Sequence, residues 1–159
     1  MATPCSCSMT DHQLYLGLGS NLGDGEANIR RAYRQIEKLI GTIVGQSAFF
    51  VSEPWGYESS HRFVNSVVRV ATRLSPRDVL CATQQIEHRM GRTQKSEHAT
   101  VDGRWTLVKT HDRIIDIDIL LYDDIHIDEP DLKIPHPLMQ QRPFVMIPLA
   151  EVLPSGSPA

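Results

Sequence analysis

Two aspartates one residue apart, Asp116 and Asp118, carry the most distinctive chemistry of this sequence. Every other residue of the run 114–120 is apolar. Residues two apart in a strand point to the same face, so the carboxylates lie side by side, where they repel each other and lose hydration. A divalent cation relieves both penalties, and Mg²⁺ typically takes one or two carboxylates together with substrate phosphates. The spacing therefore predicts a magnesium site, against the alternative of a solvated face on an edge strand.

Cationic side chains elsewhere in the chain are suited to a polyphosphate, because an arginine fork matches phosphate oxygens in a bidentate manner. The candidates are Arg92, Arg113, His136 and Arg142, and His136 stands between two prolines that fix the backbone around its imidazole. Taken singly, each of these residues is more often a surface charge or a structural side chain.

Two aromatic residues, Trp55 in Pro54-Trp55-Gly56 and Phe63, stand near an amide, Asn65. Aromatic rings supply affinity for a flat heterocycle by stacking, and an amide supplies direction. These residues therefore form a candidate heterocycle site, with core packing as the alternative.

The glycine-rich run 17–24 does not predict a nucleotide loop. It lacks the Gly-Lys-Ser/Thr ending of a Walker A loop, and Leu22 stands where a dinucleotide fingerprint needs its third glycine. We interpret it as a tight turn that caps the first helix, with Asn21 and Asp24 bonding to the backbone.

Patterns of strand and helix predict the elements that position these residues. Strands are expected at 13–20, within 42–52, at 63–74 and at 113–122, helices from Asp24 or Gly25 to Gly41 and from Ser75–Pro76 to about Gly91, and a long loop at 93–110. The order predicts an α+β, ferredoxin-like βαββαβ sandwich with helices on one face of an antiparallel sheet. A C-terminal extension follows, with a short strand or hairpin near 125–128 beside the last strand and short helices at 135–142 and 144–152.

The chain has 159 residues, which is enough for one domain. We place that domain at 13–154, between a disordered leader at 1–12 and a flexible tail at 155–159. The formal net charge of -3 does not favour a nucleic-acid-binding surface. No apolar run is long enough to span a bilayer and no signal-peptide core is present, so a cytoplasmic protein is expected. We also expect it to be a monomer. Cys5 and Cys7 are interpreted as free thiols, with a metal-binding pair as the alternative.

Several short motifs follow one another in an order that resembles the 6-hydroxymethyl-7,8-dihydropterin pyrophosphokinases of folate biosynthesis. They are Gly19–Asp24, Ser52-x-Pro54, Phe63-x-Asn65, Gln84-x-x-Glu87, Gly91-Arg92, Arg113-x-x-Asp116-x-Asp118, Pro135-His136 and Arg142-x-Phe144. No single motif is decisive, but the ordered set is highly specific and spans residues 13–154.

The resemblance implies a ferredoxin-like enzyme that transfers the β,γ-pyrophosphoryl unit of ATP to the hydroxymethyl pterin and releases AMP. It implies that Asp116 and Asp118 hold two Mg²⁺ ions and, with Arg92 and Arg113, form the catalytic set. The implied ATP contacts are Gln84, Glu87, Arg92, Arg113, Ile119, His136 and Arg142. The implied pterin contacts are Ser52, Pro54, Trp55, Phe63, Asn65 and Phe144.

The segment before Arg113 departs from the family pattern. It is longer than in compact members, and Thr110 stands where an aromatic is frequent, with Trp105 or His111 as substitutes. We expect this segment to close over both substrates, against the alternative of an inert insertion. Two other function classes stay open: a metal-dependent phosphohydrolase with the same aspartates, and a ferredoxin-like binding module, for example for RNA.

Overall fold

The computed structural model describes residues 11–21, 24–52, 63–91, 97–101, 104–109 and 114–154, with the backbone alone at 52, 97–101 and 104–109. The central strands are β2 (His12–Ser20), β3 (Gly41–Gln46), β4 (Phe50–Ser52), β5 (Phe63–Thr72) and β8 (Asp116–Tyr122). The helices are α1 (Gly25–Leu39), α2 (Pro76–Arg89) and α3 (Pro143–Val152). The smaller elements are β6 (Glu97–Val101), β7 (Arg104–Lys109), β9 (Ile127–Glu129), β10 (Leu132–Ile134) and the 3-10 turn η1 (Met139–Gln141).

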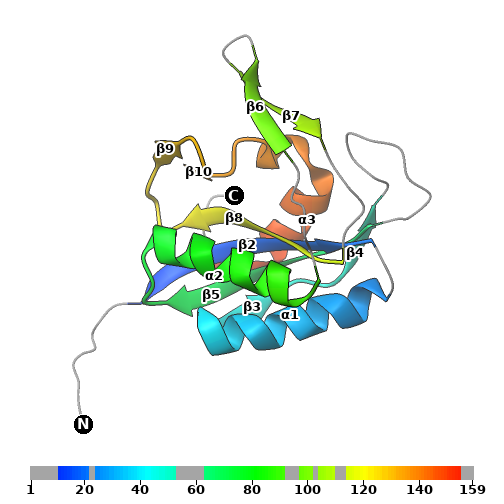
Figure 1. The fold of residues 1–159 in the computed structure, drawn as a ribbon. Helices are drawn as coiled ribbons and strands as arrows, with labels where there is room; N and C mark the ends of the chain where they lie inside the picture. The colour runs from blue at the N-terminus through cyan, green and yellow to red at the C-terminus, as the bar shows by residue number, and fades with distance from the viewer. Residues whose placement is uncertain are drawn as a thin grey trace.

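The strand β2 is an inner strand of an antiparallel sheet (Figure 1). The order is β3-β5-β2-β8, and β4 also pairs with β5. The strand pairs antiparallel with β5 along one edge and with β8 along the other. Because α1 follows β2 and α2 follows β5, this is the βαββαβ arrangement. The predicted ferredoxin-like fold class is confirmed.

Helices α1 and α2 cover one face of this sheet (Figure 1). Alternate residues of β2 point to that face, namely Leu14, Leu16 and Leu18, and they are at most 3% exposed. They share a hydrophobic core with the apolar stripes of both helices. Burial of this face supplies the driving force for the fold.

Both helices begin where the sequence predicts. The side chains of Asp24 and Ser75 each accept a hydrogen bond from the backbone N–H three residues further on, at 3.2 Å. These caps satisfy N–H groups that have no partner within the helix. The predicted capping of the first helix by Asp24 is therefore confirmed.

Helix α3 packs on the opposite face, so the helices are not confined to one side of the sheet (Figure 1). A second, smaller core lies there; its buried members are Tyr15, Val67, Leu120, Met139, Val145, Leu149 and Val152. Burial raises the pKa of the Tyr15 hydroxyl. The short helix predicted at 144–152 is thus confirmed as α3, and it covers only part of this face of the sheet.

The segment 97–109 is a hairpin and not a structureless loop, so that prediction is wrong. Strands β6 and β7 pair antiparallel and form a two-stranded sheet of their own (Figure 1). A hairpin outside the main sheet needs no continuous apolar face, so the alternation that reveals a strand is weak. The pair Asp102-Gly103 between the two strands, a frequent hairpin turn, was the available signal.

The C-terminal extension agrees with the prediction in part. The expected hairpin is confirmed, because β9 pairs with β10, but it forms a separate sheet and does not pair beside β8. Within 135–142 only the turn η1 forms, because Pro135 and Pro137 lack the N–H groups that a helix needs. Arg77 of α2 holds this hairpin by contacting Glu129 and by donating to Asp131 at 2.8 Å. That hydrogen bond lowers the pKa of the Asp131 carboxyl.

In the part of the chain that the structure describes, no helix is long and apolar enough to cross a membrane. Strand β2 begins at His12, the last residue assigned to the leader. Residues 1–10, including Cys5 and Cys7, and the tail 155–159 lie outside the described residues.

Gly41, the first residue of β3, is predicted to tolerate no side chain. A Cβ at this position would lie 2.1 Å from the backbone carbonyl oxygen of Ala71, so Gly41→Ala must push two paired strands apart. We expect urea denaturation to show a loss of about 1–3 kcal/mol in the free energy of unfolding. Gly45→Ala in the same strand is the matched control, because its nearest atoms would lie at 3.6 Å or more, an ordinary contact. Equal losses in the two variants would contradict this steric account.

Candidate active site

The two aspartates lie on β8 as their spacing predicts. Asp116 and Asp118 are partly exposed, whereas the alternating Ile115, Ile117 and Ile119 are 0, 1 and 7% exposed. The isoleucines join the core under α1 and α2. The strand therefore directs its carboxylates to the opposite face, which α3 covers only in part.

Glycines lie opposite both aspartates. Gly19 of β2 pairs with Asp116, and Gly17 pairs with Asp118. Along its other edge, Gly19 pairs with Asn65 of β5. Because directly paired residues share a face, Asp116, Gly19 and Asn65 form one row across three strands, with no side chain at its centre. We call Gly17 and Gly19 the glycine floor.

The glycine floor is the part of the site that the sequence analysis missed. Both glycines lie inside β2, within the strand predicted at 13–20, but their run was interpreted only as a turn and not as part of the site. Two glycines spaced two apart at the end of a strand pattern were the available signal, since glycine in a strand often marks a place where something approaches closely.

The Asn65 amide is held in one orientation. The side chain is 4% exposed, and its Nδ2 donates to the carbonyl oxygen of Phe50 at 3.1 Å. The amide oxygen faces the floor, because a Cβ on Gly19 would lie 3.2 Å from it and 3.5 Å from the ring of Phe63. Two of the predicted pterin contacts, Phe63 and Asn65, therefore lie together beside the row that contains Asp116.

Arg142 connects the aspartate pair to α3. Its side chain is buried, and its guanidinium Nη1 lies 4.0 Å from Oδ2 of Asp118. The same guanidinium lies 5.7 Å from the ring centre of Phe144, within the range of a cation–π contact. Three predicted site residues, Asp118, Arg142 and Phe144, are thus brought together.

His136 is fixed against the edge of β8. Its backbone N–H donates to the carbonyl oxygen of Leu120 at 3.0 Å, and its Nδ1 accepts from the backbone N–H of Leu138 at 3.2 Å. Since Nδ1 acts as an acceptor, the neutral imidazole carries its proton on Nε2. The imidazole is therefore a hydrogen-bond donor at Nε2 and an acceptor at Nδ1.

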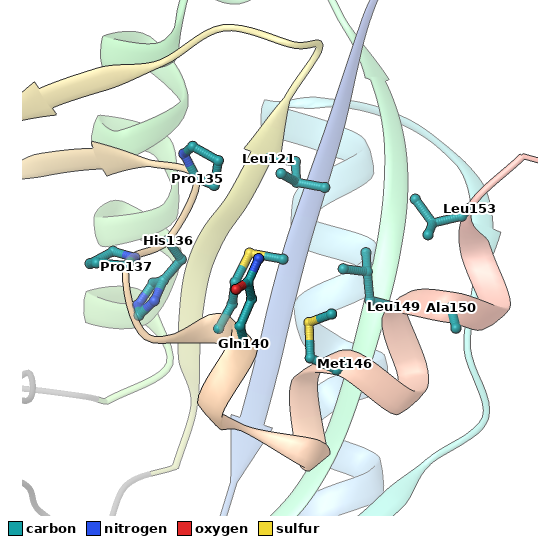
Figure 2. A pocket seen from close by; sticks show the side chains of 10 residues that line it. Leu121, Pro135, His136, Pro137, Gln140, Met146, Leu149, Ala150 and Leu153 are labelled. Carbon is teal, nitrogen blue, oxygen red and sulfur yellow. The ribbon is translucent and has the colours of Figure 1, made fainter. Parts of the chain in front are cut away.

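A cavity of about 430 Å³ lies beside His136, between β8, the segment 135–137, η1 and α3 (Figure 2). Its walls are mainly apolar, with Leu121, Met146 and Leu149 facing it. Asp116 and Asp118 are not among its lining residues. The two aspartates therefore lie outside this cavity.

The predicted ATP contacts on α2 divide into two kinds. Gln84 is exposed, whereas Glu87 is 4% exposed and its Oε2 accepts from the backbone N–H of Ile117 at 2.7 Å. Ile119, also a predicted ATP contact, lies in the core with 7% of its surface exposed.

Several predicted site residues lie outside the described residues: Pro54, Trp55, Arg92 and Arg113. Ser52 is described only through its backbone in β4, where it pairs with Phe63. The roles of these five residues stay predictions.

The donor set fits magnesium better than a metal held by protein alone. Within the described ranges, no group of three His, Cys, Asp or Glu residues could hold a metal ion. The pair Asp116 and Asp118 supplies hard oxygen ligands on a partly exposed face, and Mg²⁺ commonly completes its shell with water and substrate phosphates.

Comparison with known proteins agrees with this geometry. The family 7,8-dihydro-6-hydroxymethylpterin-pyrophosphokinase (HPPK) matches residues 15–154. A relative from Porphyromonas gingivalis is 44% identical over 142 residues, which cover 89% of this chain and 90% of the relative. A relative from Bacillus subtilis is 37% identical over 139 residues, which cover 87% of this chain and 76% of the relative. Both are named 2-amino-4-hydroxy-6-hydroxymethyldihydropteridine pyrophosphokinase.

Solved structures share the fold. An HPPK-DHPS in complex with substrates has a TM-score of 0.67 at 15% identity and covers 91% of this chain. Wild-type HPPK-DHPS of Plasmodium falciparum with SDX-DHP has a TM-score of 0.66 at 17% identity. This chain spans 40% and 41% of those longer chains. With a family match that extends from β2 to the end of α3, the chain belongs to the 7,8-dihydro-6-hydroxymethylpterin-pyrophosphokinase family.

Proposed function

We propose that this chain transfers the β,γ-pyrophosphoryl group of ATP to 6-hydroxymethyl-7,8-dihydropterin, releasing AMP, as a step of folate biosynthesis. Relatives at 35% to 44% identity carry the name of this pyrophosphokinase. The observation that supports the proposal best is the row of Asn65, Gly19 and Asp116, because it sets a fixed amide and a carboxylate on either side of a residue that has no side chain. Neither the phosphohydrolase nor the RNA-binding module is supported by the relatives.

The pterin is proposed to bind over the glycine floor. Phe63 and Phe144 offer aromatic surface, with Ser52, Pro54 and Trp55 as further contacts. The Asn65 oxygen accepts a hydrogen bond from an N–H on the polar edge of the pterin ring, since its Nδ2 donates to the carbonyl oxygens of Phe50 and Phe63. The direction given by this bond turns the hydroxymethyl group toward Asp116 and Asp118.

The phosphates are proposed to lie above the two carboxylates. Asp116 and Asp118 would hold two Mg²⁺ ions, which when bound neutralise charge on the phosphate oxygens. Arg142 and the Nε2–H of His136 donate to phosphate oxygens, together with Arg92 and Arg113. Gln84, Glu87 and Ile119 border the rest of ATP.

The transfer requires positioning and charge neutralisation and no covalent intermediate on the protein. The hydroxymethyl oxygen attacks the β-phosphorus and gives up its proton to water, an O–P bond forms, the bond between the β-phosphorus and the α,β-bridging oxygen breaks, and AMP leaves. Arg142 lies close to Asp118 and Phe144, so one residue borders both the phosphate side and the pterin side. The monomeric state, the cytoplasmic location and closure of the segment 93–110 stay predictions.

An assay of AMP separates the three function classes. With ATP and Mg²⁺ alone, the chain is expected to release little AMP, and addition of hydroxymethyl dihydropterin should start stoichiometric formation of AMP and pterin pyrophosphate. A phosphohydrolase would consume ATP without the pterin, and a binding module would form no AMP in either case. Either result would overturn the proposal.

Asp118→Asn tests the metal assignment with little change of shape. Loss of one carboxylate should lower kcat by about 10²- to 10⁴-fold, the effect of losing several kcal/mol of transition-state stabilisation. Circular dichroism and thermal melting should show a folded protein. Asp124→Asn, in the exposed turn after β8, is the control and should keep normal activity. Near-normal turnover by Asp118→Asn at ordinary Mg²⁺ would refute the assignment.

Asn65→Ala tests the pterin site by calorimetry. The pterin should lose about 1–3 kcal/mol of binding free energy, because its ring edge would lack a hydrogen-bond partner in a buried site. Binding of a non-reactive ATP analogue should barely change, and it serves as the internal control. Equal losses for both ligands would show that Asn65 is structural, through its bond to Phe50.

A further inference from the structure

Glu87 is the acidic member of a buried helix face. The other buried residues of α2 are Val79, Ala82, Thr83 and Ile86, so this face packs against the sheet. A carboxylate in such a place is costly unless it is hydrogen-bonded. The Oε2 of Glu87 accepts from the backbone N–H of Ile117 at 2.7 Å, a distance typical of a charge-assisted hydrogen bond.

The position of this bond on β8 is informative. The N–H of Ile117 belongs to the peptide unit that joins Asp116 to Ile117, so the bond falls between the two aspartates. β8 is the last strand of the main sheet. Its inner edge pairs with β2, where Gly17 and Gly19 lie opposite Asp118 and Asp116. No other strand of the main sheet lies beyond β8 among the described residues, and Glu87 takes up an N–H of that outer edge.

We propose that Glu87 is a positioning residue that fixes the rotation of β8, so that Asp116 and Asp118 both point to the open face. Both carboxylates belong to one short stretch of backbone in β8, so a small rotation about the strand axis would displace them together. A bond on the outer edge opposes that rotation where β2 cannot. This inference rests on the proposed metal role of the two aspartates, and it goes beyond the ATP contact that the family resemblance implies for Glu87.

Two variants separate the acceptor from the rest of the side chain. Glu87→Leu removes the acceptor at similar volume, and Glu87→Gln keeps an acceptor oxygen. In proton–nitrogen-15 correlation spectra of the metal-free and ligand-free protein, the amide proton resonance of Ile117 should move upfield in Glu87→Leu. It should move much less in Glu87→Gln. His88→Ala, at the exposed neighbouring position on α2, should leave this resonance unchanged. An unchanged Ile117 amide in Glu87→Leu would overturn the inference without any metal present.

Metal binding gives the second measurement. Mn²⁺ titrated in the presence of a non-reactive ATP analogue and followed by electron paramagnetic resonance should bind about 10- to 100-fold more weakly to Glu87→Leu, the usual effect of losing a group that orients metal ligands. Glu87→Gln should recover most of this loss.

The two kinds of failure differ. If the wild-type chain binds no Mn²⁺ beyond that held by the nucleotide alone, the proposed metal role of Asp116 and Asp118 is refuted, and the inference about Glu87 is refuted with it. If wild type and Glu87→Leu bind Mn²⁺ equally while Glu87→Leu binds the ATP analogue more weakly, Glu87 serves ATP alone and only the inference is overturned.

Discussion

The pairing of β2 with β5 on one edge and with β8 on the other is the constraint on which the rest of the structure depends. β2 sends Leu14, Leu16 and Leu18 into the core under α1 and α2. Because a slip of one residue would turn these leucines to the other face, their burial fixes the register of the strand. Gly17 and Gly19 must then face the opposite side. The core that stabilises the fold and the floor of the site are therefore alternate residues of one strand.

Each neighbour of β2 brings different chemistry to this floor. β5 contributes the Asn65 amide and the Phe63 ring, while β8 contributes the aspartates. A substrate that lies across Gly19 can contact the amide at one end and approach Asp116 at the other. Arg142, which precedes α3, adds a cation beside Asp118, so segments far apart in sequence meet within one small area. Glycine at position 19 allows this meeting, since a Cβ there would lie 3.2 Å from the Asn65 amide oxygen and 3.5 Å from the ring of Phe63.

Local patterns of the sequence were enough for the elements and for the face of the acidic pair, since the side-chain period of a strand places Asp116 and Asp118 together. They were not enough for the site as a whole. That Asn65 lies opposite Gly19 is a matter of register, which is set by burial along whole strands rather than by residues near either position. The hairpin at 97–109 was not predicted, because its strands need no apolar face and therefore show little alternation of apolar and polar residues. An acidic residue on the apolar stripe of α2 was visible in the sequence at Glu87, but its partner on β8 was not.

Because β8 is an edge strand, its carboxylates can be held in place and still be reached by a large anion from the side. An inner strand has partner strands on both edges, which would limit access from the side, whereas an edge strand leaves N–H and C=O groups in need of partners. Here two groups from outside the sheet supply partners: Glu87 accepts from the N–H of Ile117, and the backbone N–H of His136 donates to the carbonyl oxygen of Leu120. Both residues are also proposed ATP contacts. The segments that hold β8 in place thus border the proposed nucleotide site, so a displacement of either segment by the nucleotide would be transmitted directly to the aspartates.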